Sequence, residues 1–212
     1  MEQGQLNWVA NFIWGIADDV LRDLYVRGKY RDVILPMTVL RRLDAVLEPT
    51  KQAVLDMKAS LDKAGIANQD QALRQAAGQA FYNTSNFTLR DLKARASQQQ
   101  LKADFEAYLD GFSPNVQDIL DNFEFRNQIP RLSKADALGT LIERFLSPDI
   151  DLSPRGLDNH GMGTVFEADI GALAAAGRSA SALRSPAQPE TDCWVRGRRR
   201  VGVVGLFPSC AG

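Results

Sequence analysis

The sequence predicts an all-α fold, an irregular helical bundle with a disordered or poorly structured C-terminal tail. Apolar residues recur at the three- and four-residue spacing of a helix through much of the first 150 residues. No window of residues 1–150 shows sustained alternation of apolar and polar residues, which argues against a sheet. Composition then changes near residue 168. We therefore divide the 212-residue chain into a helical domain, residues 1–167, and a basic low-complexity tail, residues 168–212.

Two long helical segments open the domain. Residues 7–27 place their apolar side chains on one broad stripe, and we expect Gly28 to end this helix in the left-handed conformation. The pattern resumes over residues 31–63 and is closed by Gly65. Two prolines interrupt this second segment, and since proline has no amide hydrogen to donate, we expect at least one break there. These prolines are Pro36 and Pro49.

Local signals for loops and helix starts mark the second half of the domain. Residues 81–87 are predicted to form a loop, because Asn and Ser side chains compete with the helix for backbone hydrogen bonds. Thr88 with Asp91 resembles a capping box. The other signals are Ser113 before Pro114 as an N-cap, Ser133 as the N-cap of the next helix, Pro148 as its end, and residues 153–156 as a turn.

The tail differs sharply from the domain in composition and charge. In residues 171–212, six arginines face two acids, a net charge of +4, and because the whole chain carries −1 this leaves −5 for residues 1–170. Gly, Ala, Ser and Pro supply half of those last 42 positions. Residues 200–207 resemble one strand without a partner, and their two glycines lack the following helix and acid of a nucleotide-binding turn.

Several classes of protein are excluded. No run approaches the roughly 18 to 20 consecutive apolar residues of a membrane span, and residues 1–6 have no signal-peptide character, so we expect a cytoplasmic chain. Two cysteines, Cys193 and Cys210, and a single histidine are too few for a disulfide framework or a structural zinc site.

Few residues suggest catalysis or metal binding. His160 stands alone, without a second histidine or a helical-domain cysteine, and we interpret it as a loop or helix-start residue. Two carboxylate pairs, Asp18 with Asp19 and Asp149 with Asp151, lack the spacing of a calcium loop and are interpreted as solvated helix or turn residues. We predict no catalytic residue, no cofactor-binding residue and no metal ligand in this chain.

Three aromatic residues near the N-terminus lie too close in sequence to share one buried face, since positions i and i+2 point apart on a helix. They are Trp8, Phe12 and Trp14. Trp14 is a candidate contact residue for a partner, and core or partial burial is the alternative.

A basic segment offers candidate DNA contacts. Residues 22–42 hold six basic residues against two acids, a net charge of +4 inside an otherwise acidic domain. Phosphate contacts would gather there if the domain touches DNA. The candidate residues are Arg31, Arg41 and Arg42. The alternative is that these bases lie on solvated helix faces or pair with neighbouring acids.

Two stretches carry a family resemblance: residues 30–49 (YRDVILPMTVLRRLDAVLEP) and residues 157–167 (LDNHGMGTVFE). Residues 12–14 and 122–125 are consistent with it. Together these segments, spanning approximately residues 5–167, resemble the N-terminal helical domain of the modification subunit of type I restriction-modification systems.

This resemblance implies a part of an N6-adenine-specific DNA methyltransferase that uses S-adenosylmethionine. The implied partners are DNA, a specificity subunit, a second modification subunit and the restriction subunit. In that family, the segment similar to residues 163–167 leads into a catalytic domain with an Asn-Pro-Pro-aromatic motif, yet this chain has no adjacent prolines. We expect a chain truncated before the catalytic domain, with a tail typical of a shifted reading frame, inactive alone and binding no cofactor.

The resemblance therefore implies an assembly and DNA-embracing module. The alternative is a stand-alone helical DNA-binding or regulatory module of helix-turn-helix type. That alternative requires a basic, solvent-facing recognition helix after a tight turn. Only residues 29–42 approximate such a helix, with Pro36 in the middle.

Overall fold

The computed structural model describes residues 3–95, 100–165 and 167. In this part of the chain the structure is helical, and its one β feature is an isolated antiparallel bridge between Asn83 and Phe112. The α-helices are α1 (Gln3–Leu21), α2 (Arg31–Leu47), α3 (Lys51–Lys63), α4 (Asp70–Ala77), α5 (Leu89–Ala94), α6 (Leu101–Asp110), α7 (Pro114–Asn122), α8 (Ile129–Lys134) and α9 (Ala137–Phe145). Short 3₁₀ helices are η1 (Arg27–Lys29), η2 (Glu48–Thr50) and η3 (Phe125–Asn127). The all-α prediction is confirmed for these residues, and the prediction for residues 168–212 lies outside them.

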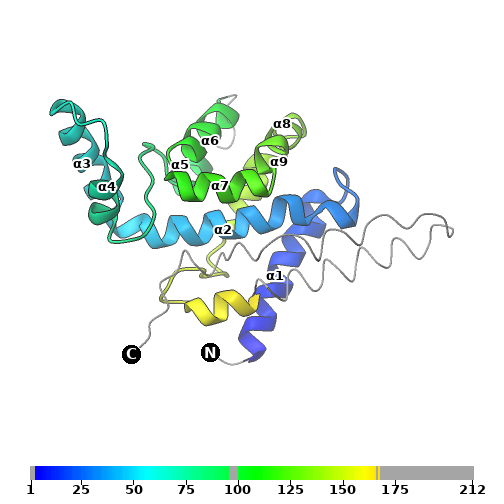
Figure 1. Cartoon of the computed structure of the whole chain (residues 1–212). Helices are drawn as coiled ribbons and strands as arrows, with labels where there is room; N and C mark the ends of the chain where they lie inside the picture. Colours follow the sequence, from blue (N-terminus) through cyan, green and yellow to red (C-terminus); the bar gives the residue numbers. More distant parts are fainter. Residues whose placement is uncertain (1–2, 96–99, 166, 168–212) are drawn as a thin grey trace, which may run out of the picture.

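Helix α2 is the centre of the fold (Figure 1). It packs against α1, α9 and η3, and twelve of its seventeen residues are buried, so no broad face of it remains for solvent. Each fully buried Leu, Ile or Val contributes roughly 1.5–3 kcal/mol to folding. Pro36 lies in the second turn of α2 without ending it, whereas Pro49 lies in η2 and separates α2 from α3. The expected break is therefore at the second proline.

Helices α3 and α4 form a hairpin that projects to one side of the body (Figure 1). Val54 is the buried residue of α3, and Leu73 and Ala77 are those of α4. The turn between α3 and α4 and the end of α4 both use glycine in the left-handed region, with φ of 68° at Gly65 and 63° at Gly78. Glycine adopts this conformation without the steric cost of a Cβ. The prediction that Gly65 ends the second segment is confirmed.

The predicted loop and caps of the second half are present. Residues 81–87 are non-helical, and Thr88 and Asp91 form the complete capping box at the start of α5. Ser113 is the N-cap residue of α7 and Pro114 its first residue, although the Ser113 hydroxyl donates to the side chain of Asn115 instead of accepting from a helix amide. Local chemistry therefore placed these helix starts correctly.

After α9 the chain folds back along the body in a segment that we call the strap, residues 147–165. It contains the predicted turn at residues 153–156 and a helical stretch at residues 159–165. Its buried apolar residues are Ile150, Leu152, Leu157, Met162 and Val165. A Cβ built on Gly161 would lie 3.2 Å from Cδ2 of Leu6, so the helical stretch packs against the first turns of α1. Figure 1 shows it in yellow beside α1.

Two predicted helix boundaries are wrong. The first helix ends at Leu21, and Gly28 lies in η1 without a positive φ. The reason is tertiary: the chain turns after Leu21 and buries Tyr25, whose amide still bonds the Leu21 carbonyl.

The second error concerns Ser133, which lies inside α8 and caps no helix. The next helix instead follows Asp136, whose φ of 52° breaks the chain direction. Aspartate tolerates this left-handed conformation better than most residues do. The apolar periodicity located α9, but a serine without a second capping signal did not locate its start.

Candidate functional site

Basic side chains are exposed at the junction between α1 and α2, residues 22–31. Lys29 and Arg31 are largely solvent-accessible, with side-chain exposures of 62% and 58%, and each lies 3.4 Å from a carboxylate oxygen of Asp32. Arg22 is also exposed. Because one carboxylate serves two cations, this surface retains positive charge for an external phosphate.

Arg131 of α8 adds a fourth basic group to this surface. Its guanidinium lies over the ring of Tyr25, 4.2 Å from the centroid, and donates to the Leu24 carbonyl. Burial raises the pKa of Tyr25, an effect that Arg131 opposes and Asp32 reinforces. Arg131 therefore lies at the same junction as Asp32. We call this group the junction cluster: Arg22, Lys29, Arg31 and Arg131.

The structure separates the three predicted DNA contacts. Arg31 remains exposed, but Arg41 is half-buried and its Nε donates to the Phe145 carbonyl at 3.2 Å. Arg42 is only 1% exposed, and its guanidinium bonds the strap. In this fold the Arg42 side chain is buried and does not lie at the surface where a phosphate would bind, contrary to the position that the sequence suggested. The reason is that α2 is the central helix.

The same burial bears on the helix-turn-helix alternative. Residues 29–42 were the only segment resembling a recognition helix, and most of them are the buried core of the domain. A recognition helix must present a face to the major groove. The segment on which that alternative depended does not meet this requirement.

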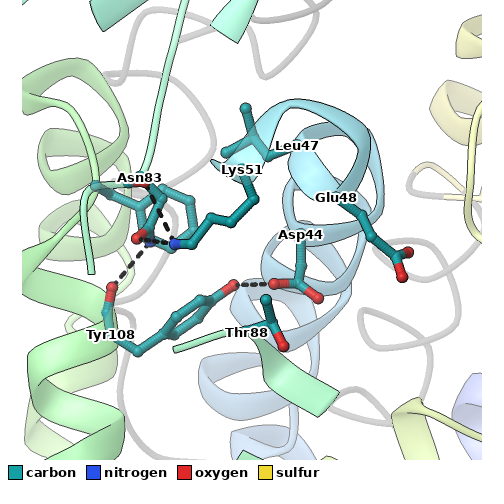
Figure 2. Close-up of a pocket in the computed structure, with 8 residues that line it drawn as sticks. Asp44, Leu47, Glu48, Lys51, Asn83, Thr88 and Tyr108 are labelled. Carbon is teal, nitrogen blue, oxygen red and sulfur yellow. Dashed lines mark hydrogen bonds between the residues drawn. The ribbon is translucent and has the colours of Figure 1, made fainter. Parts of the chain in front are cut away.

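A network of buried and half-buried polar groups joins α2, α3, α6 and the loop at residues 81–88 (Figure 2). Asp44 Oδ1 accepts the Tyr108 hydroxyl at 3.0 Å and the Leu89 amide at 3.2 Å. Burial raises the pKa of the Asp44 carboxyl, and these two hydrogen bonds oppose that shift. Burial, followed by the charge of Asp44, holds the pKa of Tyr108 well above its usual value.

Lys51 is the cation of this network. Its Nζ donates to the Asn83 side-chain oxygen at 2.8 Å, to the Asn83 carbonyl at 3.3 Å and to Ser85 Oγ at 3.4 Å. Asn83 in turn donates to the Tyr108 carbonyl at 3.0 Å, as Figure 2 shows. Burial lowers the pKa of Lys51 to about 8, against the opposing charges of Asp44 and Asp91.

The chemistry of this network is structural. Its ionisable groups already have partners inside the protein, and the cavity between them, of about 10 Å³, has room for about one water molecule. Small-molecule sites in proteins measure roughly 300–1,000 Å³. The network therefore cross-links the base of the α3–α4 hairpin to the body and leaves no room for a substrate.

The isolated acids and His160 have local roles. Asp19 lies 3.6 Å from Arg144, and Asp149 and Asp151 accept hydrogen bonds from serines two residues away. His160 is exposed at the start of the helical stretch of the strap. Across the described residues, no three His, Cys, Asp or Glu side chains gather as metal ligands, and no helix is long and apolar enough to cross a membrane. Cys193 and Cys210 lie outside this part of the chain.

Exposed aromatic surface lies on α1. Trp8 is 47% exposed, and its ring centroid lies 5.4 Å from that of Phe12. Trp14, the residue singled out from the sequence, is half-buried against the core. The exposed aromatic of this helix is therefore Trp8.

A family model, the HsdM N-terminal domain, matches residues 9–145. The chain belongs to this family. The match runs from α1 to the last residue of α9 and includes residues 30–49, so the resemblance to the N-terminal part of a type I modification subunit is confirmed there. The second resembling stretch, residues 157–167, lies beyond the match. No curated protein and no solved structure matches the chain.

Sequence reasoning missed two features of this HsdM N-terminal domain. Arg131 joins the junction cluster from 107 residues beyond Leu24, and no local pattern relates the two. Asp44 and Tyr108 are 64 residues apart. Their one signal was the position of a charged residue, Asp44, among apolar neighbours of α2.

Proposed function

We propose that this chain works in the cytoplasm as the assembly and DNA-embracing module of an N6-adenine-specific type I DNA methyltransferase subunit. The single observation that carries the proposal is the family match over residues 9–145, which spans the helical body. The proposed partners are a specificity subunit, a second modification subunit, the restriction subunit and DNA.

The proposed DNA contact is the junction cluster. Its four basic groups are exposed, and clustered Lys and Arg suffice for contacts with the phosphate backbone. Asp23 and Asp32 lie among them, which limits the net charge of the surface. The contact is therefore weak and independent of base sequence, and it assists a complex whose specificity lies in another subunit.

The proposed protein contact includes Trp8. Tryptophan is enriched among the residues that dominate the energy of protein interfaces, and Trp8 is exposed beside Phe12 on α1. Methyl transfer itself is assigned to no residue of this chain. We propose that S-adenosylmethionine binds elsewhere in the family's full subunit, because the described helical body has no cavity of the required size near its polar network.

Size-exclusion chromatography with light scattering tests the assembly role, after the full chain is mixed with the specificity subunit of a type I system. We expect a complex whose mass is the sum of its components. Trp8→Ala should weaken it at least about tenfold, as removal of an interface aromatic does. Met57→Ala, which truncates an exposed apolar residue on α3, is the matched control. A mixture whose components elute separately would contradict the assembly role.

A further inference from the structure

Arg42 connects two parts of the chain that are distant in sequence. Its Nη1 donates to the Leu152 carbonyl at 2.8 Å and to the Leu157 carbonyl at 2.6 Å, and its Nη2 donates to Asn159 Oδ1 at 2.8 Å. These acceptors follow Arg42 by 110, 115 and 117 residues, and all three lie in the strap. The centre of α2 is thereby bonded to the chain that follows α9.

These bonds are stronger than ordinary loop contacts. Hydrogen bonds from an ionised donor are roughly twice as strong as those between neutral groups. The guanidinium keeps its charge, and Asp151 and Asp158 support that charge against the burial that lowers the pKa of Arg42. A buried cation without such acceptors would be strongly unfavourable, so the arginine and the strap depend on each other.

Apolar burial alone does not explain where the strap lies. Five strap side chains are buried in the core, but hydrophobic burial is non-directional and tolerates shifts along a surface. A planar guanidinium with three acceptors specifies both distance and direction. The acceptors lie on the two residues that flank the turn at residues 153–156, Leu152 and Leu157, and at the start of the helical stretch, Asn159.

We propose that Arg42 is a positioning residue that extends the folded module past residue 145, where the family match ends, to residue 165. It holds the strap so that the chain leaves the module beside the first turns of α1. This role goes beyond the proposed function and requires neither DNA nor a partner protein.

Hydrogen exchange of the full chain tests the proposal. The reporters are the amides of Leu157 and Met162, which bond the carbonyls of Ser153 and Asp158. In Arg42→Met, which fills the core but has no donors, these amides should exchange at least about tenfold faster, while amides of α6 and α7 keep their rates. Arg42→Lys, which retains the charge but not the fork, should restore part of the protection. Unchanged strap exchange in Arg42→Met would overturn the proposal, because the apolar residues would then suffice.

Variants of Asn159 test the same contact without emptying the core. Asn159→Ala should speed exchange of the strap amides, and Asn159→Asp should slow it, because a carboxylate pairs more strongly with the guanidinium. In the Arg42→Met background both changes should lose most of their effect, which is the signature of a direct contact in a double-mutant cycle. Unchanged strap exchange in both Asn159→Ala and Asn159→Asp would overturn the proposal even if Arg42→Met were poorly folded, because both single variants retain Arg42.

Discussion

Two arginines of α2, both predicted from the sequence as DNA contacts, differ in burial and in hydrogen-bond partners. Arg31, at the first position, is exposed and lies beside Asp32. Arg42, eleven residues later, is buried and bonds three groups of the strap. The difference arises from what covers each residue: solvent at the junction with α1, and residues 152–159 over the middle of the helix. A cluster of basic residues in the sequence can therefore contain both exposed side chains and buried ones that stabilise the fold.

The largest expected effect separates these two arginines by stability. Arg42→Ala should lower the free energy of unfolding by about 3 kcal/mol or more, because it leaves a cavity and two carbonyls without their charged donor. Arg31→Ala should change it by no more than about 0.5 kcal/mol, as is usual at exposed sites. Urea unfolding of the full chain measures both values. Similar losses in the two variants would remove the distinction.

The second expected effect is on DNA binding, where substitution at the exposed start of α2 should matter and substitution of the buried Arg42 should not. We expect DNA binding with a log-log salt slope of about −3 to −4, since each of up to four phosphate contacts releases counterions. The double variant Lys29→Gln, Arg31→Gln should reduce the steepness by about two, and Arg42→Met should leave it unchanged. Fluorescence anisotropy with a labelled duplex at several salt concentrations provides the measurement. A loss of slope in Arg42→Met alone would show that the strap opens and releases this arginine on DNA.

A third, smaller effect compares two cations inside the fold, the buried Arg42 and the half-buried Lys51. Arginine stays charged at all ordinary pH values, whereas burial lowers the pKa of Lys51 to about 8. Between about pH 8 and pH 10 the unfolded chain binds more protons at Lys51 than the folded chain does, so this lysine makes the free energy of unfolding rise with pH. Above that range the raised pKa of Tyr108 acts in the opposite direction.

The comparison of wild type with Lys51→Met isolates the contribution of this lysine. As pH rises from 8 to 10, the unfolding free energy of wild type should increase relative to that of Lys51→Met. Arg42→Met, measured in the same buffers, should show no such trend relative to wild type. A flat difference for Lys51→Met would mean that the Lys51 amine keeps an ordinary pKa.

The smallest expected effect is that of S-adenosylmethionine, which should not change the thermal stability of the chain. A ligand at one hundred times its Kd would stabilise the fold by about 2.7 kcal/mol, a shift that thermal unfolding detects readily. We expect no shift with the full chain and no saturable heat in a calorimetric titration. One-to-one binding would place a cofactor site in this chain and contradict that part of the proposed function.

Local chemistry was sufficient for much of the helical structure. The capping box at Thr88 and Asp91, the serine and proline that start α7, and the left-handed glycine after α3 depend on neighbours within a few residues, and all were predicted correctly. The boundaries that failed, near Gly28 and Ser133, are places where tertiary packing of a residue such as Tyr25 decides the course of the chain. The family, too, followed from the sequence over residues 9–145.

Whether each charged residue is buried, and which groups it bonds, depends on how the helices pack. Arg42 and Arg31 have the same side chain on the same helix, and no local capping or spacing signal predicts that one is buried and the other exposed. Their roles depend on whether a segment more than one hundred residues away lies over them. The same holds for Lys51 with Asn83 and for Asp44 with Tyr108. Capping and periodicity act between residues a few positions apart, whereas burial and its hydrogen-bond partners depend on the assembled three-dimensional structure.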